Sequence, residues 1–125
     1  MDLLELLKKR YSVRKFDDRE VEKEKLDLIL EAGRVAPTAV NFQPQRILVI
    51  ESQEALENLK KCTPYHFNAP LALLICYDNT VSWKRGHDGY EMGPVDASIV
   101  TTQMMLEVEN IGLGTTWVGF FKIEL

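Results

Sequence analysis

The sequence has few cysteines and no long apolar run, and each scarcity excludes a class of protein. The two cysteines among 125 residues, Cys62 and Cys76, have a spacing that fits neither a zinc site nor a redox motif. A disulfide-rich secreted scaffold is therefore excluded, and the two thiols predict a reducing, cytoplasmic setting without a secretory leader. The longest apolar run, residues 71–77, is far too short to cross a bilayer, so we expect no membrane segment.

The chain also lacks an excess of positive charge. Its 15 basic and 19 acidic residues give a net charge of −4. Nucleic-acid binding depends on neutralising phosphates with a basic surface, so we do not expect a nucleic-acid partner. His87, Asp88 and Glu91 have no further ligands at usable spacing, so we expect no metal site. The hydrophobic fraction of 46% and the length instead predict one globular domain with a substantial core.

Hydrophobic periodicity predicts an alternation of helices and strands. Helices are expected over residues 2–9, 22–32, the run after Ser52, and 94–111, and strands over 47–50, 71–77 and 115–121. Gly33 is expected to cap the second helix at its C-terminus, and Ser52 the third helix at its N-terminus. The last helix is apolar around most of its circumference, which predicts a place at the centre of the fold or of an interface. Such alternation favours an α/β or α+β domain.

Two arginines and a serine alternate in the N-terminal segment. Side chains in an extended chain alternate between faces, so Arg10, Ser12 and Arg14 would form one row of donors there. Planar guanidinium groups and a hydroxyl are well suited to bind a phosphate. On this pentapeptide alone, however, a solvated basic turn that includes Lys8 and Lys9 is the commoner interpretation.

Two further loops are rich in polar side chains. Two prolines flank Thr38, Asn41 and Gln43 in residues 36–44, and a residue that precedes proline prefers an extended backbone, so we expect a rigid loop. Residues 78–93 form an irregular polar stretch with aromatic residues. We interpret that stretch as a substrate-facing lid, with a merely mobile loop as the alternative.

Four segments, in this order, resemble the FMN-dependent nitroreductase family. Residues 10–16 (RYSVRKF) resemble its N-terminal arginine–serine–arginine segment, and residues 36–44 (APTAVNFQP) its proline–serine–x–x–asparagine–x–glutamine–proline loop. Residues 70–77 resemble its buried strand after a proline, and residues 112–119 (GLGTTWVG) its glycine–leucine–glycine turn and tryptophan strand. Tyr11 replaces a usual basic residue, Thr38 a usual serine, and Thr116 stands where cysteine is frequent.

The resemblance implies an α+β fold, a three-layer α/β/α sandwich with a central mixed sheet, in an intertwined homodimer with two FMN sites at the interface. It implies that the first segment holds the flavin phosphate, that the proline-flanked loop approaches the same flavin from the other subunit, and that the tryptophan strand supplies backbone groups near the ring. The implied cofactor-binding residues are Arg10, Tyr11, Ser12, Arg14, Pro37, Thr38, Ala39, Asn41, Gln43, Trp117, Val118 and Gly119. The side chain of Trp117 is expected in the core.

The activity that the resemblance implies is an FMN-dependent oxidoreductase. It would pass hydride from NADH or NADPH through flavin N5 to a nitroaromatic, a quinone or a similar acceptor, and no catalytic side chain is expected because the flavin carries the chemistry. The alternatives are FMN binding without turnover and a family branch with other flavin chemistry, such as reductive dehalogenation. Family members continue beyond the tryptophan strand, so residues 1–125 are expected to be a single FMN-binding domain of a C-terminally short member or a fragment.

Overall fold

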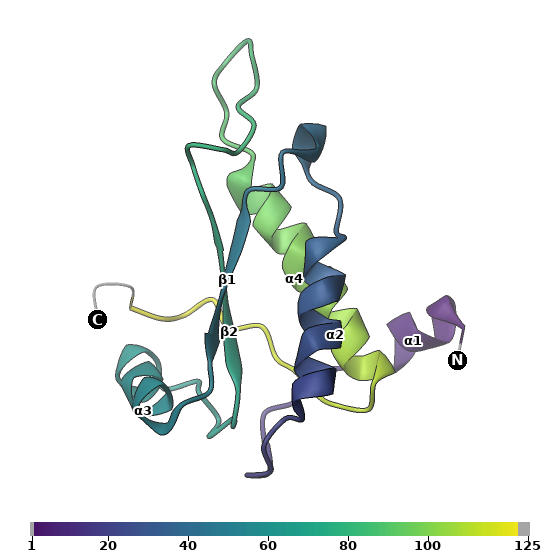
Figure 1. Ribbon diagram of the computed structural model, residues 1–125, viewed down its shortest axis with the longest axis vertical. Coiled ribbons are helices and arrows are strands. Elements are labelled where there is room, and N and C mark those ends of the chain that lie inside the picture. The colour runs from purple at the N-terminus through teal and green to yellow at the C-terminus, as the bar shows by residue number, and fades with distance from the viewer. Residues whose placement is uncertain (1, 123–125) are drawn as a thin grey trace.

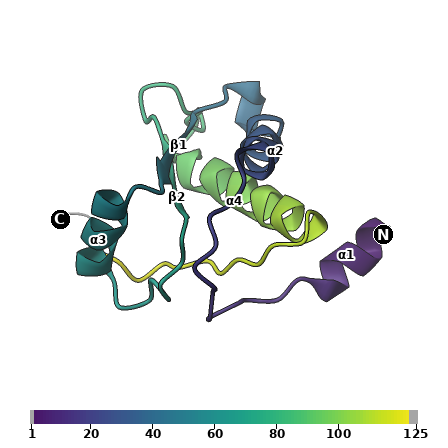
Figure 2. The same cartoon turned by 60° about the horizontal axis from the view of Figure 1, so that its bottom comes forward.

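A computed structural model describes residues 2–122, which form five helical segments and two strands. The elements are α1 (Leu3–Lys9), α2 (Lys23–Arg34), the short 3-10 helix η1 (Ala39–Asn41), β1 (Gln45–Ile50), α3 (Gln53–Cys62), β2 (Ala72–Tyr77) and α4 (Gly93–Asn110). The pair α2 and α4 lies on one side of the strands, and α3 lies on the other side in both views (Figures 1 and 2). No helix within residues 2–122 is both long and apolar enough to cross a membrane.

The two strands pair in an antiparallel ribbon. Gln45 lies opposite Tyr77 at one end and Ile50 opposite Ala72 at the other. Residues 2–122 form no other sheet, so the prediction of a central mixed sheet is wrong for the described part of the chain.

The predicted third strand, residues 115–121, is also wrong as a sheet strand. Its one bridge is a parallel contact between Ser12 and Thr115. A strand needs a continuous neighbouring backbone for its hydrogen bonds. The described part of this chain offers residues 116–121 no such neighbour, and they run extended without a ladder.

The helix α4 is the centre of the core, as predicted. Val100, Met104 and Val108 lie four residues apart on one face and pack with Ile29 and Ala36. Val100 is 0% exposed. The helix α4 contacts α1, α2 and both strands, whereas Val95 and Ile99 on its other face are exposed.

The ends of two helices test the predicted caps. Ser52 caps α3, because its hydroxyl accepts a hydrogen bond from the backbone N–H of Ala55 at 3.1 Å. The prediction for Gly33 is wrong, since α2 continues past it. A Cβ at Gly33 would lie 2.7 Å from Sδ of Met104, so this glycine permits the close approach of α2 to α4.

Candidate functional site

The two donor-rich segments lie towards opposite ends of α2. The segment between α1 and α2 passes the lower end of α2 in Figure 1, and η1 follows the upper end of α2. The 12 residues of α2 correspond to a length of roughly 18 Å. Within one chain, the predicted phosphate-binding residues and the proline-flanked loop therefore form two separate clusters.

The N-terminal segment lies beside the segment that follows α4. The N–H of Val13 donates to the carbonyl of Thr115 at 2.8 Å, and Ser12 forms the parallel bridge with the same residue. A Cβ at Gly114 would lie 2.7 Å from Cγ2 of Val13, so glycine is needed for this close approach. Arg10 ends α1 with an extended backbone, as expected for the row of donors.

Arg10 carries a buried nitrogen that lacks a partner. Its Nη1 has no hydrogen-bond acceptor within residues 2–122, and no ion pair of the described chain involves Arg10 or Arg14. Arg14 is exposed and Ser12 half-buried. A buried guanidinium nitrogen without an acceptor is costly, and an anionic oxygen such as that of a phosphate is a strong partner for it. These residues therefore fit the phosphate of FMN.

The segment after Thr115 offers unpaired backbone groups. Its far end is anchored, because the Thr63 hydroxyl donates to the Phe120 carbonyl at 2.6 Å and the Lys122 N–H donates to the Cys62 carbonyl at 2.8 Å. Between the anchors, the N–H groups of residues 116–119 donate to nothing within the described chain. They are available to the edge of a ring that accepts hydrogen bonds.

Two aromatic side chains near these groups are exposed. Trp117 is 50% exposed, so the prediction that its side chain lies in the core is wrong. Tyr11 is 67% exposed. The expectation for Trp117 failed because residues 116–119 have no covering element in the described chain, although tryptophan is usually well buried.

The proline-flanked loop has a strained backbone. Val40, Asn41 and Gln43 have φ values of 57°, 55° and 53°, a region that β-branched residues such as valine rarely adopt. Thr38 holds the turn together. Its carbonyl accepts from the Asn41 N–H at 2.9 Å, and its hydroxyl accepts from the Gln43 N–H at 3.0 Å. The side chains of Asn41 and Gln43 are exposed and make no hydrogen bond to another described residue, so their amides are free to meet a ligand.

The sequence analysis missed Asp96, which contacts this loop from the first turn of α4. Its Oδ1 accepts a hydrogen bond from the N–H of Ala39 at 2.9 Å. The side chain is 1% exposed, and Oδ2 is buried with no partner within residues 2–122. One signal could have revealed it: Asp96 is the only charged residue in residues 93–106.

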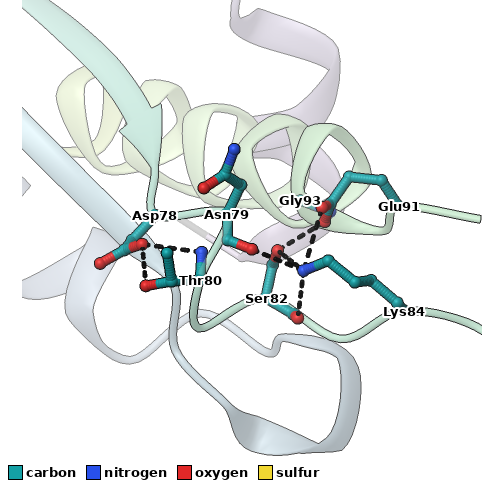
Figure 3. Close-up of polar contacts among 7 residues, drawn as sticks. All are labelled: Asp78, Asn79, Thr80, Ser82, Lys84, Glu91 and Gly93. Atoms are coloured by element: carbon teal, nitrogen blue, oxygen red, sulfur yellow. Dashed lines mark hydrogen bonds and ion pairs between the residues drawn. The ribbon is translucent and has the colours of Figure 1, made fainter.

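Residues 78–93 form an arm that projects beyond the body of the molecule and is organised by its own polar contacts (Figures 1 and 3). The Glu91 carboxylate accepts from the buried Ser82 hydroxyl and from the Gly93 N–H, and it pairs with the Lys84 ammonium at 3.3 Å. The Ser82 hydroxyl, then the Gly93 N–H, then Lys84 lower the pKa of Glu91 below its ordinary value. The arm is therefore a defined hairpin-like structure, and its role as a lid stays a prediction. Within the described residues, no group of three or more His, Cys, Asp and Glu side chains could hold a metal ion.

Comparison with known proteins shows the family. The sequence model of the nitroreductase family matches residues 7–65 and 60–125. A protein of Methanothermobacter thermautotrophicus, provisionally described as an NADH dehydrogenase/NAD(P)H nitroreductase, is 35% identical over 127 residues, which cover 99% of this chain and 64% of that protein. The chain thus spans about two thirds of the length of this relative.

Solved structures share the fold. A nitroreductase family protein from Clostridium difficile superposes with a TM-score of 0.94 at 46% identity, over 98% of this chain and 70% of that one. A provisionally assigned nitroreductase from Desulfovibrio desulfuricans, solved in complex with FMN, gives a TM-score of 0.83 at 29% identity, over 94% of this chain and 67% of its own. The fold is therefore of the nitroreductase-like α+β type, and the chain belongs to the nitroreductase family.

Proposed function

We propose that residues 1–125 form one FMN-binding domain of an oxidoreductase that uses NADH or NADPH. The observation that carries this proposal is the buried, unpartnered Nη1 of Arg10, which lies two residues before Ser12 in the sequence. The relatives support it, since one is described as an NAD(P)H nitroreductase and another was solved with FMN. A cytoplasmic location, predicted from the two thiols, stays a prediction.

The N-terminal segment would bind the phosphate end of FMN. Arg10 and Arg14 supply permanent positive charge, and Ser12 supplies a hydroxyl donor. The free N–H groups of residues 116–119 lie on the neighbouring segment, where they would donate to the ring edge. The family resemblance assigns four more residues to this part of the flavin site: Tyr11, Trp117, Val118 and Gly119.

The proline-flanked loop would approach the flavin of a second copy. This loop, which holds Pro37, Thr38, Ala39, Asn41 and Gln43, and the segment that follows α1 lie towards opposite ends of α2 (Figure 1), so we do not expect one chain to join both clusters. A second copy that packs in the opposite direction can bring one cluster of each type together.

An open groove along α4 suits such a second copy. It has a volume of about 540 Å³ and runs from Pro94 to Leu106 on the face opposite the core. Val95 and Ile99 in this groove are 39% and 38% exposed. Burial of these apolar side chains would favour association of two chains.

When bound, FMN would supply the redox chemistry, that is, transfer of hydride from NADH or NADPH through its N5 to an acceptor such as a nitroaromatic or a quinone. The residues of this chain would bind and orient the cofactor. We propose no protein group as a general acid, because Asn41, Gln43 and the backbone donors do not titrate near neutral pH.

Titration of FMN with the purified chain tests the proposal. We expect the flavin fluorescence to change until one FMN is bound per chain, and the bound flavin to lose its colour when NADH or NADPH is added without oxygen. A folded chain that leaves FMN free in solution contradicts the proposal. Bound FMN that keeps its colour with both nicotinamides would show binding without turnover.

A further inference from the structure

We propose that Asp96 is a positioning residue for the flavin-facing loop, an inference that rests on the proposed function. Its carboxylate would fix Ala39, and through it the exposed amide of Asn41, in the geometry that meets the flavin ring. Asp96 itself would not touch the cofactor.

The contact links a rigid element to a strained one. Asp96 lies in the first turn of α4, whose next turns pack in the core at Val100 and Met104. Ala39 begins η1, the turn in which Val40 and Asn41 adopt positive φ. Non-glycine residues with positive φ persist only where the surroundings hold them. Asp96 is the one residue outside the loop whose side chain accepts a hydrogen bond from η1 within the described chain.

The burial of Asp96 favours a positioning role over surface stability. The side chain is 1% exposed, and one carboxylate oxygen has no partner in the described chain. A stability-optimised core would hold an apolar side chain here, because a buried carboxylate is costly. A costly group is retained where its hydrogen bond fixes a backbone segment, and the bond to Ala39 fixes the loop.

Three variants separate positioning from plain stability. Asp96→Ala removes the acceptor. Asp96→Asn keeps an acceptor oxygen and replaces the unpartnered charged oxygen by a neutral amide, which is no costlier to bury. Val100→Ala is the matched control, since it truncates a fully buried core residue one turn further along α4 that packs in the cluster with Ala36 but forms no hydrogen bond to η1.

The first readout is amide hydrogen exchange of Ala39 in the FMN-free chain. We expect exchange to accelerate about tenfold in Asp96→Ala, in line with the loss of one buried hydrogen bond, and to stay near the native rate in Asp96→Asn and Val100→Ala. This readout needs no cofactor, so it tests the contact even if the chain proves not to bind FMN.

The second readout is flavin affinity. Asp96→Ala should lower the affinity for FMN and for riboflavin equally, by about tenfold, because the loop would face the ring and not the phosphate. Asp96→Asn should bind flavin within about threefold of the native affinity. Val100→Ala should lose thermal stability but keep its flavin affinity. The visible spectrum of bound flavin should shift in Asp96→Ala alone.

Two results would overturn the inference: native flavin affinity in Asp96→Ala, or an equal loss in Asp96→Ala and Val100→Ala at matched stability. If Asp96→Ala does not fold, Ala39→Pro removes the donor instead, and the extended backbone of Thr38 tolerates a following proline. Native flavin affinity in Ala39→Pro would then be the contradicting result. Failure of the native chain to bind FMN would count against the proposed function and not against the Ala39 contact.

Discussion

Arg10 and Asp96 each hold one buried polar atom without a partner in the described chain. Such atoms cost free energy, and we propose that binding at Arg10 and positioning at Asp96 outweigh that cost. The pattern of residue types indicated Arg10 from sequence, because arginines two residues either side of a serine suit a phosphate, and this role stays a prediction. Asp96 was not predicted, since its contact to Ala39 bridges 57 positions along the chain and no local pattern reports such a distance.

At the residue scale, Arg14→Ala tests phosphate recognition. Loss of a charged hydrogen bond, worth about 1.5–3 kcal/mol, should lower the affinity for FMN roughly tenfold to a hundredfold. Riboflavin, which lacks the phosphate, should be affected much less. Calorimetric titration of both ligands measures the difference, and Lys15→Ala is the control because Lys15 is exposed and alternates to the other side of the segment. Equal losses for both ligands would show that Arg14 does not contact the phosphate.

The individual elements follow local rules closely, and their failures have identifiable causes. Ser52 was found as a cap because hydroxyl capping is local. Gly33 was wrongly predicted to be a cap. A glycine is needed there because Met104 of α4 approaches closely, and this contact is distant in sequence. Residues 115–121 have the composition of a strand, but composition cannot supply the neighbouring backbone that a strand needs.

The groove on α4 yields a prediction about association. Ile99→Glu would place a charge in the centre of the apolar contact, which we expect to raise the dissociation constant of a dimer at least about a hundredfold. Light scattering after size-exclusion chromatography measures the mass over a range of concentrations. Leu48→Glu is the control, since Leu48 is 57% exposed on β1, away from the groove. The same mass for Ile99→Glu and the native chain would mean that the groove is not the interface.

The arm of residues 78–93 should loosen in acid. The pKa of Glu91 is lowered in the folded arm, which means that the ionised carboxylate stabilises the arm. This stabilisation is complete above the ordinary glutamate pKa of about 4.3 and is lost as the pH falls through the lowered pKa. We expect the amide NMR signals of Ser82 and Gly93 to shift over that range. In Glu91→Gln this transition should disappear, while Asp88, whose pKa its Arg85 partner lowers, still titrates. A transition that persists in Glu91→Gln would assign it to another group.

At the scale of the whole molecule, the α+β character and the central position of α4 were predictable from periodicity and from apolar residues around the helix. The pairing of the strands in the sheet was not predictable, because it depends on contacts between residues far apart in sequence. The same limit applies to the site. Sequence order places the donor-rich segments near one another along the chain, whereas the structure separates them along α2 (Figure 1). We therefore propose that a site which uses both segments is shared between two chains.

The most direct test of this shared site uses two damaged chains, Arg14→Ala and Asn41→Ala, each chosen to bind FMN weakly. The pure variants must first be shown to dimerise. Co-expression with two different tags then allows mixed dimers to be purified, in which a shared arrangement puts both defects in one site and none in the other. The account predicts that about half of the sites in mixed dimers bind FMN with native affinity. If each site were built from a single chain, every site would keep one defect, and the absence of any recovery in verified mixed dimers would contradict the account.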